Sequence, residues 1–496
     1  MRKILVLMII CTLLNAKILC TKSIALEVLD QNLELLAQEK AKNASFSWLA
    51  EKVNIITKSE DINATDNLGN TRLHYATFLE NSEAINLLLR MGADITKLNN
   101  NGQDFLAILK VLIDKEKDQK RKNTLTTRYQ QILRFIAQKD IHQRFQNGDT
   151  LLHRAVDVQE SSLVIEFLKQ IDPNTPNNLG LTSLHVAAAE SLVYPALLNQ
   201  LLTHGALPNL QTAAGNTPLH AAAMFFTGNP LTINKLLEYG ASPDIQNNNG
   251  DTPIHKMLET LNELIKEYTQ AKKARAILDE KLTIIQRAAQ ALFSLLNHAK
   301  NKNIQDDFGN TALYHLILLS ATKEPEIYNV LNPLIELLTT SPATNPNIQN
   351  RDGFTALHAA VAQQNPQLVK LLLTQGANPL IRSYTQPRTI AQVKSGQVPP
   401  PDKTPRELAQ AIKVALPLEQ QLPLIEIENA LYKKEQQLGQ TQGQPRLQQE
   451  RPESPAPLVI PQPMSHKSPT PPQTLTALEG AVADLMTALQ QLQKIL

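Results

Sequence analysis

Groups of apolar residues, rich in Leu and Ala, recur along the chain, and each group follows a polar turn that contains a glycine. The spacings between successive turn glycines are 33, 46, 32, 35, 35, 59 and 44 residues, and these glycines are Gly69, Gly102, Gly148, Gly180, Gly215, Gly250, Gly309 and Gly353. Four of the spacings lie close to one unit of about 33 residues. The pattern therefore predicts an internal repeat built from short helices.

Seven of these glycines are followed by a four-residue sequence that begins with Thr and ends with His or Tyr, as in Thr217-Pro218-Leu219-His220. Thr is a good N-cap, and Pro suits the first turn of a helix because its φ angle is already fixed. A glycine after a Leu-rich run supplies a left-handed C-cap. Each unit is thus predicted to be a helix-turn-helix pair that buries its apolar faces only by stacking on its neighbours.

These helix starts, together with Gly-Ala endings such as Gly240-Ala241, resemble the ankyrin-repeat family from Asp61 to about Ala415. The resemblance implies an all-α fold, an ankyrin-repeat solenoid of helix-turn-helix units with short hairpin turns, here placed at residues 58–415. It also implies that the histidine of each helix start hydrogen-bonds the neighbouring turn and ties adjacent repeats together. These repeat histidines are His74, His153, His185, His220, His255 and His358.

The repeat pattern is broken at three places. Gly102 is followed by a sequence that lacks both Thr and His, which predicts a degenerate repeat with an insertion at about 110–140. Residues 258–300 contain neither Gly nor Pro and predict a helical hairpin that projects from the array. The unit of Gly309 has Tyr314 in the histidine position.

The N-terminal residues differ from the repeats. Basic residues followed by an apolar run and Ala16 match a secretory signal peptide over 1–16, with a buried N-terminal helix as the alternative. We therefore expect a secreted or periplasmic protein. Lipid anchoring at Cys20 fits poorly, because Leu19 stands where a small residue is expected. Residues 22–57 predict a helical N-terminal cap.

The C-terminal part contains three further segments. A closing helix is predicted at 416–438, and the Pro- and Gln-rich residues 439–473 predict a disordered linker. Residues 474–496 predict an amphipathic, coiled-coil-like helix for self-association, with docking on another helix or a membrane surface, or on the solenoid itself, as alternatives. Its apolar positions step by three and four residues and are Leu475, Leu478, Val482, Leu485, Leu489, Leu492 and Leu496.

Charge and motifs limit the chemistry that we expect. Lys and Arg number 48 against 46 Asp and Glu, so no overall field favours nucleic acid. No phosphate loop, metal-ligand spacing or nucleophile motif is present, and histidines one repeat apart do not converge. We therefore predict no cofactor, no metal, no membrane span and no enzymatic activity.

The resemblance implies that partners bind the concave surface of hairpin tips and first helices. It places exposed binding residues shortly after the histidines, at Phe78, Leu79, Asp157, Val158, Ala189, Glu190, Met224 and Phe225. Phe226 is expected to fill a gap between repeats instead. The predicted function is a protein-binding scaffold, in the setting of a secreted host-interacting factor. The alternatives are an enzyme or toxin with its site at 258–300, around Tyr268, and a structural envelope component.

Overall fold

The computed structural model describes residues 30–31, 33–34, 36–38, 59–189, 195–274, 278–322, 324–384, 402–416 and 420–442. The chain divides into one unit that ends at Gly439 and a second unit, Gln440–Leu496. All the repeats belong to the first unit. In the second, only residues 440–442 are described, and they form the last turn of a helix.

Several predicted segments lie outside the described residues. They are the signal peptide at 1–16, the heptad helix at 474–496 and all but the first residues of the linker at 439–473. Of the predicted N-terminal cap, only residues 30–38 (without 32 and 35) and part of what precedes the first repeat are described, and residues 30–38 are helical.

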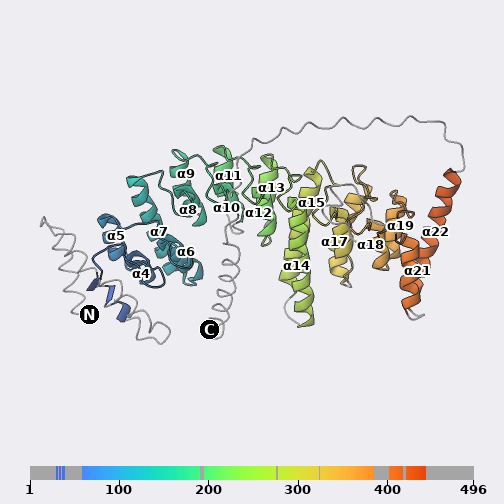
Figure 1. Cartoon of the computed structure of the whole chain (residues 1–496), viewed down its shortest axis with the longest axis horizontal. Helices are drawn as coiled ribbons and strands as arrows, with labels where there is room; N and C mark the ends of the chain where they lie inside the picture. The colour runs from blue at the N-terminus through green and yellow to red at the C-terminus, as the bar shows by residue number, and fades with distance from the viewer. Residues whose placement is uncertain are drawn as a thin grey trace, which may run out of the picture. The chain divides into compact units, whose positions relative to one another are not determined.

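Helices follow one another in pairs, and the two helices of each pair pack together (Figure 1). The pairs, each given as first and second helix of a repeat, are α4 (Arg72–Phe78) and α5 (Ser82–Met91), α6 (Phe105–Lys115) and α7 (Gln119–Lys139), α8 (Leu151–Asp157) and α9 (Ser161–Leu168), α10 (Ser183–Ala189) and α11 (Pro195–Thr203), α12 (Pro218–Met224) and α13 (Leu231–Glu238), α14 (Pro253–Lys273) and α15 (Asp279–His298), α16 (Ala312–Leu319) and α17 (Pro325–Thr340), α18 (Ala356–Ala362) and α19 (Pro366–Thr374). Two more helices, α21 (Pro405–Ala415) and α22 (Leu422–Gln442), complete the array. The closing helix thus ends at Gln442, beyond the predicted 438.

The repeats stack because each first helix packs against the first helix of a neighbour, as α10 does against α12, and α12 against α14. Second helices form a parallel row, with α11 against α13 and α13 against α15. The fold is therefore the all-α repeat solenoid that the sequence predicts.

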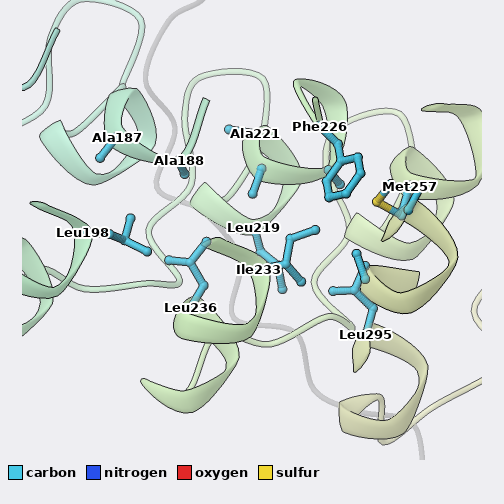
Figure 2. Packing of buried hydrophobic residues seen from close by; sticks show 14 of the residues in the cluster. Ala187, Ala188, Leu198, Leu219, Ala221, Phe226, Ile233, Leu236, Met257 and Leu295 are labelled. Atoms are coloured by element: carbon cyan, nitrogen blue, oxygen red, sulfur yellow. The ribbon is translucent and has the colours of Figure 1, made fainter. Parts of the chain in front are cut away.

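The core is a continuous apolar layer between the two rows of helices. Figure 2 shows part of it, where Leu198, Leu219, Ile233, Leu236 and Met257 come from three successive repeats, and each is at most 1% exposed. Full burial of one such side chain contributes about 1.5–3 kcal/mol. Because the helices of each repeat pack against those of its neighbours as well as against each other, part of this stabilisation depends on stacking.

The longest departures from the repeat period lengthen helices of existing repeats. Helix α14 has 21 residues and α15 has 20, whereas α12 has 7. Thr252 caps α14 just as Thr217 caps α12, so residues 258–273 continue the repeat's own first helix. The residues predicted as an inserted hairpin are therefore extensions of both helices, and α14 extends well past α12 in Figure 1.

Candidate functional site

The repeat histidines occupy equivalent places in their helices. In repeat five, the backbone N–H of Thr217 donates to Nδ1 of His220 at 3.1 Å, and Nε2 of His220 donates to the carbonyl of Asp251 in the next repeat at 2.9 Å. Four other histidines make the same inter-repeat bond at 2.9–3.1 Å, and these are His74, His153, His185 and His358. The role implied by the resemblance is therefore observed at five of the six positions.

Burial keeps these histidines neutral. All six are at most 3% exposed. Burial lowers the pKa of His74 and His153, and it lowers the pKa of His185, His220, His255 and His358 to about 4. A neutral imidazole with one acceptor and one donor nitrogen is the form that joins a helix start to the next turn.

Successive hairpin turns are also joined by backbone hydrogen bonds. The N–H of Ala213 donates to the carbonyl of Leu179 at 3.0 Å, and the N–H of Asn248 donates to that of Ala214 at 3.0 Å. The same bond, at 2.8–3.0 Å, links four more pairs of turns, with the donor first: Asn100 and Leu68, Asn178 and Asn147, Arg351 and Phe308, Tyr384 and Asp352.

Two junctions lack this turn-to-turn bond among the described residues: the one between the turns of Gly102 and Gly148, and the one between the turns of Gly250 and Gly309. At the second junction, Nε2 of His255 also has no hydrogen bond of ordinary geometry. Gln246 still donates to the carbonyl of Gln305 there, at 3.0 Å. Each of these junctions follows a repeat with a lengthened helix.

At the first of these junctions, a buried ion pair takes the place of the histidine bond. The repeat of Gly102 has Asp104 as its N-cap, and Oδ2 of Asp104 accepts from Nη2 of Arg154 at 2.6 Å. Arg154 also lies 3.3 Å from Asp149, and its guanidinium stacks over the ring of Phe145 at 4.7 Å. A similar pair, Arg72 with Asp30 at 2.6 Å, ties the helical residues near 30 to the first repeat.

The predicted binding residues fall into two groups. Met224 and Phe225, at the end of α12, are 42% and 55% exposed, while Phe226 is buried at 7%. Phe226 lies in the loop between α12 and α13 and packs in the core, whereas the two residues before it, Met224 and Phe225, face outward. Met224 and Phe225 therefore form an exposed apolar pair at the end of a first helix.

The first repeat corrects the prediction at Leu79, which is 6% exposed. Leu79 is the C-cap of α4, and the chain reverses directly after it at Glu80, whose φ is 58°. Leu79 thus belongs to the buried core. Phe78 and Val158 are only partly buried and pack at the edge of the same core.

Three predicted residues remain, namely Asp157, Ala189 and Glu190. Asp157 is partly buried and its carboxylate lies 3.8 Å from Nζ of Lys110. Glu190 lies outside the described residues, and Ala189 is partly buried against the core.

Sequence reasoning missed a second set of exposed apolar residues in the turns. Leu68, Leu179 and Phe308 each stand directly before a turn glycine, and Phe308 is 69% exposed. The signal was present, since this position is polar or Ala in the other turns. Leu318, at the end of α16, is likewise exposed at 44% and was not selected.

Several features bear on the other functional classes. In the described part of the chain, no three metal-ligating side chains gather as a metal site would require. None of the described helices is long and apolar enough to cross a membrane. Tyr268, around which an enzymatic site was considered, is 2% exposed and belongs to the core.

Two family models match parts of the repeat array. A family model described as ankyrin repeats in three copies matches residues 184–270 and 282–383, and a single ankyrin repeat matches 68–100. One solved structure, the ankyrin repeat domain of Bcl-3, described as a unique member of the IkappaB protein family, aligns at 20% identity with a TM-score of 0.34, over 61% of this chain and 98% of that one.

Ankyrin repeats are in general non-enzymatic and indicate a protein–protein interaction scaffold. The matched residues include the first repeat up to residue 100 and most of α10 to α19, whereas residues 101–183 lie outside the matches. The chain is an ankyrin-repeat protein.

Proposed function

We propose that this protein binds a partner protein through the surface formed by the ends of its first helices, with Met224 and Phe225 as the anchor. The observation that carries the proposal is the exposure of this apolar pair on a helix whose other residues are buried. Aromatic and Met side chains are favoured at the centres of protein interfaces. The role is non-enzymatic recognition by a preformed surface.

The rigidity of that surface supports the proposal. Helix α12 is held by the His220 hydrogen bond on one side and the His185 hydrogen bond on the other. A preformed surface loses little conformational entropy when a partner binds.

The test is capture of partners by the full chain, with their identification and a dissociation constant for each purified partner. The double substitution Met224→Ser with Phe225→Ser should weaken binding about tenfold or more, as expected for loss of a central anchor. Phe293→Ser is the matched control, because Phe293 is an exposed aromatic residue, 43% exposed, on the second helix α15. Equal affinities for the double variant and the wild type would overturn the proposal.

Export to the periplasm or outside the cell belongs to the same proposal. Its support is the basic and apolar sequence of residues 1–16. N-terminal sequencing of the protein from its native cell should begin after Ala16, whereas a chain that retains these residues would contradict export by this route. Action on the proteins of a host is the setting in which we expect such an exported scaffold to work.

A further inference from the structure

Three turns of the array carry an Asn-Gly pair. The pairs are Asn101–Gly102, Asn147–Gly148 and Asn249–Gly250, and the asparagine of each is exposed. In such a pair the backbone nitrogen of the glycine can attack the asparagine side chain, because glycine has no side chain to obstruct the approach. The attack displaces ammonia and closes a succinimide ring. The three sites therefore share one chemistry and differ in their surroundings.

The reactive nitrogen of each pair is hydrogen-bonded in the folded chain. The N–H of the glycine donates to the carbonyl three residues earlier, at 2.9 Å for Gly102, 2.8 Å for Gly148 and 3.0 Å for Gly250. The ring can close only after this bond breaks and the peptide between asparagine and glycine rotates. The rate at each site therefore depends on the free energy of opening that turn locally.

The turn of Gly148 is held by several further bonds. The carbonyl of Asn147 accepts from the backbone N–H of Asn178 at 3.0 Å, so the peptide that must rotate is bonded to the next repeat. Nη1 of Arg144 donates to the carbonyl of Gly148 at 3.0 Å, and Nδ2 of Asn147 donates to Asp149 at 2.7 Å. All three bonds oppose the reaction at Asn147.

The turn of Gly250 keeps part of this support. In the described part of the chain no backbone bond joins it to the following turn. Nε2 of Gln246, however, donates to the carbonyl of Gly250 at 2.7 Å and to that of Gln305 in the next repeat at 3.0 Å. Asp307 also covers the glycine, since a Cβ at Gly250 would lie 3.0 Å from its Oδ1. Asn249 is therefore an intermediate case.

The turn of Gly102 lacks all of this support. Among the residues that the structure describes, neither the carbonyl of Asn101 nor that of Gly102 accepts a hydrogen bond, and the side chain of Asn101 makes none. Leu98 stands four residues before the glycine, where Arg144 and Gln246 stand in the other two turns, and it has no side-chain donor. A Cβ at Gly102 would meet no atom within 4 Å, so no neighbouring turn covers the glycine.

We propose that Asn101 is a site of spontaneous deamidation in the folded protein. The nitrogen of Gly102 attacks Cγ of Asn101, the bond from Cγ to the side-chain nitrogen breaks, and the proton of the Gly102 N–H leaves with that nitrogen as ammonia. Water then hydrolyses one of the two carbon–nitrogen bonds of the succinimide, which gives aspartate or isoaspartate. The reaction needs water and no other reagent. The inference is independent of the proposed function.

The products would act on the junction between the first and second repeats. Both add a carboxylate three residues before Asp104, the N-cap of α6. Isoaspartate also adds a methylene to the backbone shortly before Gln103, whose carbonyl accepts from Nε2 of His74 at 3.0 Å. Modification of Asn101 thus changes the chain next to an inter-repeat hydrogen bond.

The experiment is peptide mapping by mass spectrometry after the folded full chain is incubated at mildly alkaline pH, with chromatographic separation of aspartate from isoaspartate. Asn101 should react about tenfold or more faster than Asn147, because opening the turn of Asn147 breaks further hydrogen bonds. Asn249 should react at an intermediate rate. In denaturant all three should react at similar rates, because the Asn-Gly pair is the same.

Two reciprocal substitutions test the cause of the difference. Leu98→Gln supplies the donor that Gln246 provides in its own turn and should slow the reaction at Asn101, whereas Gln246→Leu should speed the reaction at Asn249. Asn147 is the internal control, and its rate should stay the same in both variants, whose fold circular dichroism checks.

Equal rates at the three sites of the folded wild type, or a slower reaction at Asn101 than at Asn147 or Asn249, would overturn the proposal. Rates that neither substitution changes would also overturn it, because the turn bonds would then not control the reaction.

Discussion

The junction between the fifth and sixth repeats differs from the junction that follows it. At the first, His220 donates to the carbonyl of Asp251 at 2.9 Å, and the turns are joined by a backbone bond from Asn248 to Ala214 at 3.0 Å. At the second, His255 lacks the corresponding hydrogen bond and no backbone bond joins the turns of Gly250 and Gly309 in the described part of the chain. There the long α14 and α15 pack on α16 and α17 instead.

This difference bears first on stability. A regular junction joins its helix start to the next repeat through the histidine bond and through the backbone bond between the turns. The junction after α14 has fewer bonds between its turns, and α14, with 21 residues, is much longer there than α16, with 8. We therefore expect the regular junctions to contribute more to stability and, under the proposed function, recognition to depend on the exposed ends of the first helices, such as Met224 and Phe225.

Of the changes considered, acid should lower the stability of the folded protein most, and it should act on the regular junctions. Burial lowers the pKa of His220 to about 4, against about 6.5 in an unfolded chain, so the unfolded state binds more protons between these values. Stability contributed by the neutral histidines is therefore complete above pH 6.5 and is lost as the pH falls towards 4. Each pKa unit corresponds to about 1.4 kcal/mol for each histidine.

The measurement is the thermal melting of the wild type and of His220→Gln across this pH range. At pH 7 the wild type should be the more stable protein, and the difference should narrow as the pH falls from 6.5 to 4. A difference that stays constant would show that protonation of His220 does not limit stability.

Loss of the buried ion pair should have the next largest effect. Asp104→Ala leaves Arg154, which is 7% exposed, without its closest partner and should destabilise the protein by about 3–5 kcal/mol. Denaturant unfolding monitored by circular dichroism measures this change. Asp114→Ala is the control, because Asp114 is half exposed in its pair with Lys110 and its loss should cost about 1 kcal/mol or less. Similar losses for both variants would contradict the importance of the Asp104 pair.

The two neighbouring histidines give a direct test of the junction difference. His220→Ala removes the inter-repeat bond and leaves the N–H of Thr217 without its partner, while the carbonyl of Asp251 keeps the bond from the N–H of Asn247 at 2.8 Å; we expect a cost of about 1–3 kcal/mol. His255→Ala removes the bonds to its own helix start and an edge contact with the ring of His315, but no inter-repeat hydrogen bond of ordinary geometry, so its cost should be smaller by about 1 kcal/mol. An equal or larger loss for His255→Ala would remove the distinction between the junctions.

The smallest expected difference in stability is between alanine substitutions at two turn glycines, Gly215 and Gly102. Gly215 and Gly102 both have a positive φ, of 78° and 70°. A Cβ at Gly215 would lie 2.7 Å from the backbone nitrogen of Asn248, whereas at Gly102 it would meet no atom within 4 Å. Alanine at Gly102 should therefore cost only the strain of the left-handed conformation, about 1–2 kcal/mol, and alanine at Gly215 should cost more. Equal melting temperatures of the two variants would contradict this.

The sequence predicts the regular parts of the fold because those parts depend on local signals. A helix start is specified within four residues by Thr217, Pro218 and His220. The hydrogen bonds of His220 to its own helix start and to the next turn follow because the next repeat has the same geometry. The position of Leu79 was predicted wrongly because its burial depends on the reversal at Glu80, a backbone conformation that residue types do not specify. The Asp104–Arg154 pair was not predicted because its members are 50 residues apart.

The candidate surfaces were predictable only in part. Exposure of Met224 and Phe225 matches the prediction from the helix-end position. The groove between α14 and α16 was not predicted from the sequence. It depends on the relative lengths of two packed helices from different repeats and not on any motif.

Hydrogen exchange of the full chain with and without a purified captured partner tests the central claim most directly. We predict slower exchange on binding in peptides that cover 222–228, at the exposed end of α12. The buried repeat histidines and the outer face of α15 around Phe293 should exchange as in the free protein. Protection confined to the second helices, with residues 222–228 unchanged, would contradict recognition through the first-helix surface.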